Sequence, residues 1–443
     1  MIHWQRATND VKLVRGFKTE LAPNNVQRSL LARTAGCARF AYNWGLARRI
    51  EEYKATGRSS SAIDQHKQLN RLKVAEFPWM YEVSKCAPQE ALRDLDSAYQ
   101  HFFRRVKNGE KPGFPRFKAK HRSPPKFKIN SKCAVSACKI HLPHIGWVKL
   151  KEKKYLPATG DPSARQLAVA VKGTGSGRWF VSVQCEVEVK DPQPSPKAVA
   201  ALGIDLGLKN YAVLSDGSEP AKPPKSLSKA LKKLRRLQRR VARRQRDSSN
   251  RIKAVRRVNA THFRVASLRR EFIHQLTNWL VKTKPALVYI VEDLNIKGMA
   301  GNRRLSRAIA DVGWGEFLRQ LAYKTGWNGY RMVKADRWFP SSKMCSKCHA
   351  INHGLKLEDR TFVCPSCGFV IDRDLNAAVN LSRYEEYVAT GIWAPREKKK
   401  EQDSRDELPP VRREVTPVER SAPKGPRGSR KKTQAPMSGK AAC

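Results

Sequence analysis

Acidic residues are scarce in this sequence. Asp and Glu number 39 against 88 Lys and Arg, so the formal net charge of the 443-residue chain is +49. A compact fold with this excess would repel itself strongly unless a polyanion neutralised the charge. The imbalance is too large for a solubility device and favours nucleic acid as the partner.

Long apolar runs are also lacking. The run Ala286–Val291 (ALVYIV) has the length of a strand and falls far short of a membrane span. The first residues, MIHWQRATNDVKLVRGF, contain no apolar segment of a secretory signal. An anionic membrane surface is the alternative partner, but neither an amphipathic anchor nor a lipidation motif is visible. We therefore expect a soluble cytoplasmic protein with no membrane partner.

Regularly spaced cysteines are few, since only four of the ten form a pattern. Cys345 and Cys348 form one Cys-x2-Cys pair, and Cys364 and Cys367 form a second pair after fifteen intervening residues. This spacing is typical of a four-thiolate zinc ribbon. Four thiolates leave no open coordination position, so the zinc would be structural. Zinc binding is worth on the order of 10–16 kcal/mol in zinc-finger peptides, enough to order so short a segment.

The other cysteines and histidines give no comparable signal. His349 and His353 lie inside the ribbon loop, and we expect them to be solvated or to support the ligands rather than to bind metal. The segment CAVSACKIHLPHI contains a second group, whose members are Cys133, Cys138, His141 and His144. Its spacing matches no metal site, and its alternation predicts strands that would separate the side chains. We leave it out of the metal prediction and expect the cysteines outside the ribbon to be free thiols or small core residues.

The first half of the chain changes from strand to helix and back to strand. Residues 11–20 alternate as a strand does, whereas 21–57 and 87–106 have the period of helices. Residues 109–129 are rich in Gly, Pro and Lys and predict an extended basic connection. Short strands follow as far as Val189 and could close into a barrel, and KDPQPSPK (190–197) is a linker.

The most basic stretch is residues 225–270, which hold 18 Lys and Arg against one acid, Asp247. Apolar residues recur there at helical spacing and predict two long helices that fold back near Arg246–Asn250. A solvated face is the alternative, but solvated faces usually mix charges of both signs. We favour a helix pair that faces nucleic acid. From about residue 394 the chain loses its aromatics, cannot bury enough apolar area, and is predicted to be disordered.

Three carboxylates stand next to apolar segments. Asp205 lies in the apolar run LGIDLG, Glu292 ends the run LVYIVE, and Asp374 starts the helical segment DLNAAVNL, where it could also serve as an N-cap. A buried carboxylate is costly unless it is paired, protonated or bound to metal. If neighbouring parallel strands carry the first two, all three converge at the carboxyl ends of the strands. Two Mg²⁺ ions roughly 3.5–4 Å apart would offset their repulsion and drive phosphodiester hydrolysis, which indicates a nuclease.

These segments also resemble a known family. GIDLGLKNYAVLSDG, YIVEDLNIKGM and CGFVIDRDLNAAVNL resemble the three motifs of a RuvC-like nuclease domain, which has the RNase H fold. The four-cysteine insertion before the third motif, introduced by FPSSKMCSKC, is characteristic of TnpB proteins from bacterial and archaeal insertion sequences. ARFAYNWGLARRIEEY, ALRDLDSAYQHFFRRV and GFPRFKAK resemble further stretches of that family, so that the likeness covers roughly residues 10 to 385.

The resemblance implies an RNA-guided DNA endonuclease related to compact type V CRISPR effectors. Its partners would be a guide RNA and double-stranded target DNA bearing a short adjacent motif, with no small-molecule substrate, in a prokaryotic, nucleoid-associated setting. Asp205, Glu292 and Asp374 would be the catalytic acids and the magnesium ligands. Asp374 is preferred to Asp372 because the third acid of the family immediately precedes x-Asn-Ala-Ala. Structural zinc would be held by the four cysteines.

The family architecture predicts a multidomain chain of α+β and α/β class. A β-barrel wedge domain would contain an inserted helical recognition domain, and an RNase H-like (RuvC) domain would contain a zinc ribbon that binds target nucleic acid. The expected segments are wedge 1–24, recognition 25–119, wedge and linker 120–197, RuvC-like 198–340 with its basic helix pair at 225–275, zinc ribbon 341–370, RuvC-like 371–390, and a disordered basic tail 391–443.

Two other functions remain open on the sequence. One is a structure-selective junction nuclease that uses the same acids without a guide, and the other is an RNA-guided repressor that binds DNA without cutting it. The presence of all three acids disfavours the repressor, and the extent of basic sequence disfavours the junction nuclease. Besides the basic helix pair, PRFKAKHRSPPKFK (115–128) is a candidate backbone contact. Phe114, Phe117 and Phe127 could stack on bases, although packing is favoured for any one of them.

Overall fold

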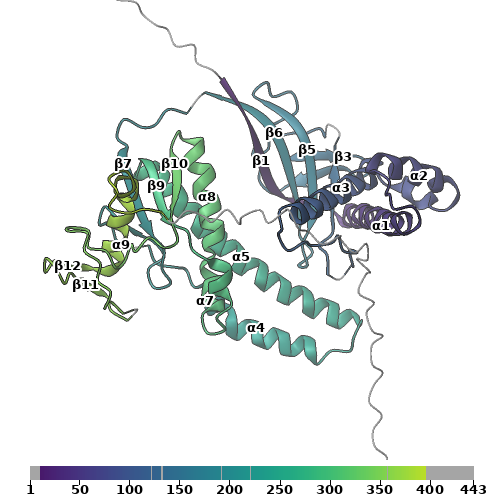
Figure 1. Ribbon diagram of the computed structural model, residues 1–443. Coiled ribbons are helices and arrows are strands. Elements are labelled where there is room, and N and C mark those ends of the chain that lie inside the picture. The colour runs from purple at the N-terminus through teal and green to yellow at the C-terminus, as the bar shows by residue number, and fades with distance from the viewer. Residues whose placement is uncertain are drawn as a thin grey trace, which may run out of the picture. The chain divides into compact units, whose positions relative to one another are not determined.

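The computed structural model describes residues 10–395 apart from His121, Ser131, Lys132, Asp191, Pro220 and Leu357 (Figure 1). The predicted tail at 391–443 lies outside these residues except for its first five positions. Within the described part, no helix combines the length and the apolar composition that a membrane crossing requires.

A six-stranded antiparallel sheet is assembled from two distant parts of the sequence. Its strands are β1 Asp10–Ala22, β2 Lys126–Ile129, β3 Lys139–Leu142, β4 Gly146–Leu150, β5 Ala164–Gly173 and β6 Trp179–Lys190, in the order β2-β5-β6-β1-β4-β3. β1 pairs with β6 from Asp10–Lys190 to Leu21–Trp179, so the first strand lies inside the sheet. Among the described residues no ladder joins the end strands β2 and β3, so the predicted barrel is not closed by strand pairing there.

The segment between β1 and β2 is helical. It contains α1 Asn25–Thr56, α2 Ala62–Ala75, a 3-10 turn at Pro78–Glu82, and α3 Cys86–Lys107. Asn24 caps α1 in a reciprocal pair with Gln27, and Gly57 ends it in the left-handed region at φ 70°. Leu31, Leu92 and Leu95 are fully buried between these helices, and they share one core with the sheet. α2 lies in a stretch that the sequence pattern did not assign to a helix.

A second sheet follows the linker. Its strands are β7 Val199–Asp205, β8 Val213–Leu214, β9 Ala286–Glu292 and β10 Arg331–Ala335, in the order β10-β9-β7-β8. β7, β9 and β10 are parallel, and β8 is antiparallel to β7. Helices cover both faces, which explains why the middle of β7 and of β9 is nearly all apolar. Ile204 and Tyr289 pack with residues of α5 and α8 on one face, whereas Ile290 packs with α9 and α10 on the other.

A pair of long helices, α4 and α5, lies between β8 and β9 in the sequence, and shorter helices and a hairpin follow β9. The elements are α4 Ser226–Ala242, α5 Ser249–Thr283, α6 Ile296–Ala300, α7 Ser306–Val312, α8 Trp314–Trp327, α9 Arg373–Ser382, α10 Tyr384–Ala389, and the small hairpin β11 Thr361–Val363 with β12 Val370–Asp372. α4 and α5 lie side by side in Figure 1 and reverse between residues 242 and 249. The predicted basic helix pair and its fold-back point are therefore confirmed.

Gly203 brings helix α9 against strand β7. A Cβ atom on Gly203 would lie 1.9 Å from the carbonyl oxygen of Ala378 and 2.5 Å from the amide nitrogen of Ser382. Both are backbone atoms of α9, so no side-chain rotation could relieve the clash. Only glycine therefore allows the helix to lie this close to the strand, two residues before Asp205.

We predict that Gly203→Ala separates α9 from β7 and lowers the free energy of unfolding by about 2 kcal/mol or more, because overpacking against backbone forces the helix to move. The change should appear as a lower melting temperature in circular dichroism. Gly326→Ala in α8 is the matched control, since no atom lies within 4 Å of its added Cβ. Alanine there should be neutral or mildly stabilising. Equal melting temperatures for the two variants would contradict the prediction.

Candidate functional site

The carboxyl ends of β7 and β9 place two acids side by side. The parallel ladder pairs Ile204 with Val291, and Asp205 and Glu292 are the next residues of their strands. Both residues keep some exposed surface, yet protein surrounds their carboxyl groups. The structure thus brings together two acids that are 87 positions apart in the sequence, as the two apolar runs predicted.

Asp374 joins them from the first turn of α9. Burial raises the pKa of Asp205 well above its ordinary value, and the charges of Glu292 and then Asp374 raise it further, while Arg373 opposes them. Burial also raises the pKa of Glu292, a hydrogen bond from Ser341 lowers it, and the charge of Asp374 raises it. The three acids therefore form one interacting group, in which each ionised member disfavours ionisation of the others.

Asp372, the other candidate for the third acid, has a different task. One of its carboxylate oxygens accepts hydrogen bonds from the backbone N–H groups of Asp374, at 2.9 Å, and Leu375, at 3.0 Å. It is therefore the N-cap of α9, and Asp374 is the second residue of the helix. The suggestion that Asp374 itself could cap the helix is wrong, because that position is already occupied by its neighbour.

Two further acids near the strand ends are paired elsewhere. Asp293 Oδ2 lies 3.3 Å from Arg337 Nη2, and its other oxygen lies 3.9 Å from Lys334 Nζ. Asp336 accepts a hydrogen bond of 2.8 Å from the backbone N–H of Trp338. The acid that raises the pKa of both Asp205 and Glu292 is Asp374.

The donor set of the carboxylate group suits hard divalent cations, which prefer oxygen ligands. Within the described residues, the three carboxylates do not all lie within 4.8 Å of one another, whereas the sulfurs of the ribbon do. Magnesium–oxygen bonds are about 2.0–2.1 Å long, so one ion requires closely clustered oxygens. Two ions roughly 3.5–4 Å apart can bridge carboxylates that are more widely spaced. The carboxylates therefore suit a divalent cation by the type of their donor atoms, but their oxygens do not form a compact group as the sulfurs do.

The four cysteines of the predicted ribbon form a compact cluster. Their sulfur atoms all lie within 4.8 Å of one another, with 3.8 Å between Cys345 and Cys367 and 3.4 Å between Cys348 and Cys364. A tetrahedral zinc ion with Zn–S bonds of about 2.3 Å would separate its sulfurs by about 3.8 Å. The cluster is thus close to the size that zinc requires, although it comes from segments on either side of the loop 349–363.

Backbone N–H groups donate hydrogen bonds to two of these sulfurs, which favours their thiolate form. The N–H of Lys347 points to Cys345 Sγ and that of Cys367 to Cys364 Sγ, both at 3.4 Å. Hydrogen bonding from the Cys367 backbone lowers the pKa of Cys364 to about 6. A hydrogen bond from Ala350 lowers the pKa of Cys348, but the neighbouring sulfurs outweigh it and raise that pKa to about 12. Crowded thiolates favour retention of a proton unless a metal replaces it.

The other cysteine and histidine residues do not join a metal group in the described part of the chain. Cys133 is buried, Cys138 is exposed, and the ring of His141 lies 5.4 Å from that of Trp147. His349 packs its ring 5.0 Å from that of Tyr387 instead of adding to the sulfur cluster.

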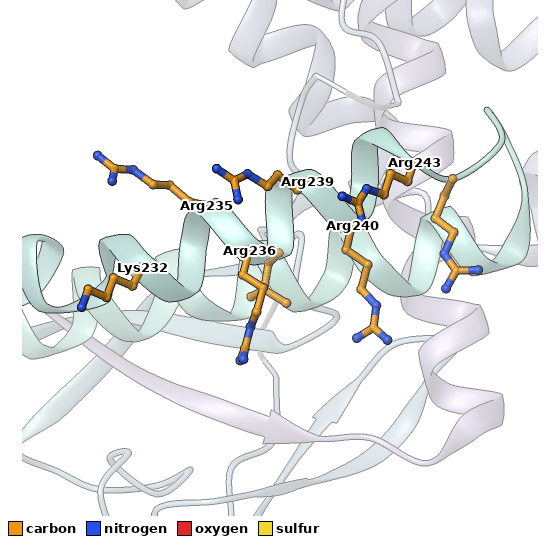
Figure 2. A pocket seen from close by; sticks show the side chains of 8 residues that line it. Lys232, Arg235, Arg236, Arg239, Arg240 and Arg243 are labelled. Carbon is orange, nitrogen blue, oxygen red and sulfur yellow. The ribbon is translucent and has the colours of Figure 1, made fainter.

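A basic surface runs along α4. Its cationic members line a hollow of about 1080 Å³, and they are Lys232, Arg235, Arg236, Arg239, Arg240, Arg243 and Arg244. Figure 2 shows Arg235 and Arg239 extending to one side of the helix and Arg236 and Arg240 to the other. Within the described residues, none of the seven has a carboxylate within 4.0 Å. Like charges at i, i+4 destabilise a helix, so this surface favours a polyanionic partner.

The three candidate stacking aromatics differ. Phe127 is buried in the core of the first sheet. Phe114 is partly exposed and packs its ring edge-on against Tyr99 and Phe102. Phe117 is 58% exposed. Packing is thus the main role of the first two, and Phe117 alone of the three presents most of its surface to solvent.

Comparison with known proteins identifies the family. A protein of Streptomyces pristinaespiralis named "Putative RNA-guided DNA endonuclease" is 34% identical over 374 residues, which cover 83% of this chain and 88% of that protein. The chain belongs to the TnpB family. The Escherichia coli K12 protein "Putative RNA-guided DNA endonuclease InsQ" is 30% identical over 397 residues, covering 84% of this TnpB chain and 92% of InsQ.

Family descriptions match three segments of the TnpB chain. "Cas12f1-like, TNB domain" matches residues 314–381, "Probable transposase" matches 182–303, and "Helix-turn-helix domain" matches 13–58. The first of these spans the four cysteines. The last has a name that does not describe its fold here, because these residues form strand β1 and the single long helix α1.

A solved structure supports the fold. The Cas12f1 chain of a cryo-EM structure of the Cas12f1–sgRNA–target DNA complex aligns with a TM-score of 0.50 at 15% identity, covering 84% of this chain and 99% of that chain. The RuvC-like prediction agrees with this likeness and with the parallel sheet that carries Asp205 and Glu292.

We predict one zinc ion per chain, held by the four cysteines. Replacing Cys345 and Cys348 with Ser should release it and lower the melting temperature, because two of four thiolate ligands are lost. Inductively coupled plasma mass spectrometry of the purified protein measures the metal. Cys138→Ser is the control, since this exposed cysteine lies outside the cluster and should keep a full zinc complement. Equal zinc in both variants would refute the assignment.

Proposed function

We propose that this TnpB chain is an RNA-guided DNA endonuclease that hydrolyses target DNA with Asp205, Glu292 and Asp374 as its catalytic acids. The observation that carries the proposal is the register of β7 and β9, which sets two buried carboxylates next to each other with a third on α9. Curated relatives that cover most of the chain are named as RNA-guided DNA endonucleases, which supports the guided activity.

The three acids would hold two Mg²⁺ ions. Bound there, such ions supply an activated water and stabilise the leaving oxygen. The chain's own part is to hold the carboxylates close together and oriented, whereas the bound cations would keep them ionised. Strand pairing fixes Asp205 and Glu292, and the cap formed by Asp372 fixes the first turn of α9 and with it Asp374. The charge repulsion that raises the pKa of Asp205 and Glu292 would also favour the binding of a cation there.

The remaining segments would serve the nucleic acids. We assign the first sheet to a wedge domain and helices α1–α3 to a recognition domain, as the family architecture implies. The ribbon at residues 341–370 would contact the strand being cut, because it precedes Asp374 by only a few residues. The α4 basic surface would grip a phosphate backbone, whereas sequence would be read by guide pairing and by a short motif beside the target.

Substitution of the acids tests the nuclease. Asp374→Asn should reduce plasmid cleavage by at least about a thousandfold, as expected when a residue that holds catalytic metal is neutralised. Asp372→Asn is the matched control, because Asn caps helices about as well as Asp and removes the same charge two positions away. Cleavage is measured with protein purified together with its co-expressed RNA, at saturating Mg²⁺.

The two neighbouring acids give opposite expectations. If Asp372→Asn were inactive and Asp374→Asn active, the third acid would be misassigned. If Asp205→Asn, Glu292→Gln and Asp374→Asn all cut normally, the proposed centre would be wrong. RNA-dependent DNA binding without cutting in the parent protein would favour a repressor, and cutting without RNA would favour a junction nuclease.

The α4 basic surface predicts a salt effect. Replacing Arg235, Arg239 and Arg243 with Gln should reduce the slope of log K against log salt for the co-purifying RNA by about 2, since each phosphate contact contributes about 0.7–0.9. Fluorescence anisotropy at several salt concentrations measures the slope. The same three positions changed to Lys keep the charge and should keep the slope. An unchanged slope in the Gln variant would show that α4 does not contact the RNA.

A further inference from the structure

One hydroxyl connects the segment before the first cysteine pair to the carboxylate centre. The Oγ of Ser341 donates a hydrogen bond of 2.6 Å to Glu292 Oε1. Ser341 is 3% exposed, so this contact is shielded from water. A hydrogen bond to a carboxylate is stronger and more directional than one between neutral groups, and it fixes one oxygen of Glu292 in place. The sequence analysis missed this residue, which lies in the polar run FPSSKMC.

Two asparagines of helix α9 hold the backbone of residues 341–346, which includes Ser341. Asn380 Nδ2 donates to the carbonyl oxygens of Ser341, at 2.8 Å, and Met344, at 2.6 Å. Asn376 Nδ2 donates to Met344 at 2.7 Å, and its oxygen accepts from the N–H of Ser346 at 3.1 Å. Both asparagines are fully buried. Loss of any of these partners would leave a buried polar group unsatisfied, at a cost of about 1–3 kcal/mol.

Backbone hydrogen bonds also connect the residues after Ser341 to the loop of the cysteine cluster. The N–H of Cys345 donates to the carbonyl oxygen of Ala350 at 2.9 Å, and the N–H of Asn352 donates to that of Lys343 at 2.8 Å. Only three residues lie between Ser341 and Cys345, whose sulfur is the first of the cluster. A displacement of the cysteine knuckle would therefore move the backbone of Ser341, and the hydroxyl would lose its position against Glu292.

We propose that Ser341 is a positioning residue, through which the ordered cysteine knuckle fixes Glu292 and sets the affinity of the carboxylate centre for divalent cations. The inference rests on the proposed function, because it assumes that Glu292 binds metal. Partners in the outer shell of a metal site orient its ligands, and their loss typically reduces metal affinity or activity about 10- to 100-fold. A purely structural serine would affect folding and leave metal affinity unchanged.

The test measures Mn²⁺ binding to the RNA-free full-length protein by isothermal titration calorimetry. The Asp374→Asn variant serves as the reference that lacks the proposed site. Ser341→Ala should weaken binding by about 10- to 100-fold, with the zinc content and the melting temperature close to those of the parent. Ser341→Thr keeps the hydroxyl and should recover most of the affinity. Ser342→Ala, the same change one position on at a half-buried residue, should have no effect.

The Mg²⁺ concentration for half-maximal plasmid cleavage should rise by the same factor in Ser341→Ala. If Ser341→Ala loses zinc or melts early, Ser341→Cys replaces it, because a thiol has a similar volume but is a weak donor. Its affinity should fall as well. Parental Mn²⁺ affinity in a folded Ser341→Ala or Ser341→Cys variant would overturn the inference.

A double-mutant cycle tests the route through the knuckle. The Cys345→Ser, Cys348→Ser pair should also weaken Mn²⁺ binding, and adding Ser341→Ala to it should weaken binding by less than about threefold more, because the two changes act on one path. If the losses of Mn²⁺ affinity in the two sets of variants were fully additive, the cysteine knuckle would not act on Glu292 through Ser341. If the parent binds Mn²⁺ no better than Asp374→Asn, the proposed nuclease centre fails. If the parent binds and Ser341→Ala binds equally, only the inference fails.

Discussion

Two carboxylates at the ends of parallel strands and a third in the first turn of α9 repel one another, and the second sheet and its helices are arranged to keep them together against that repulsion. The ladder between β7 and β9 fixes the separation of Asp205 and Glu292 through backbone hydrogen bonds, which are indifferent to the charge of the side chains. Burial raises the cost of their ionisation further. The geometry is therefore stable only because packing elsewhere supplies the energy, and the proposed cations would make it favourable.

Helix α9 is the element on which the other parts of the centre converge. It is only ten residues long, yet it carries Asp374 in its first turn, rests on Gly203 of β7, and holds residues 341–346 through Asn376 and Asn380. A shift of this helix would alter the proposed catalytic acid, the strand contact and the ribbon at the same time. This arrangement accounts for the short distance in sequence between the cysteine cluster and the proposed third acid.

Much of this centre could be predicted from the sequence, because apolar runs that end in acids identify neighbouring strands and the cysteine spacing identifies the ribbon. Local sequence patterns alone could not decide whether Asp372 or Asp374 is the third acid, and the choice required the family motif. The N-cap role of Asp372 depends on the backbone conformation at the start of α9, which the residue pattern does not reveal. Ser341 itself has no signal in the local sequence, because its partner Glu292 lies 49 positions away. The sequence does show two asparagines at i, i+4 in NAAVNL, polar residues on the buried side of a helix, which indicate that a buried backbone segment packs against them.

The long pairing of β1 with β6 has a consequence for how the chain is made. β1 ends at Ala22 and its partner begins only at Trp179, so on the ribosome the first strand leaves the exit tunnel well before the strand that completes its hydrogen bonds. At translation rates of about 5–20 residues per second, the delay is on the order of ten to thirty seconds. The intervening helices can fold in that time, whereas β1 must wait with open backbone groups. Nascent chains that stall within this interval should be the ones most dependent on chaperones.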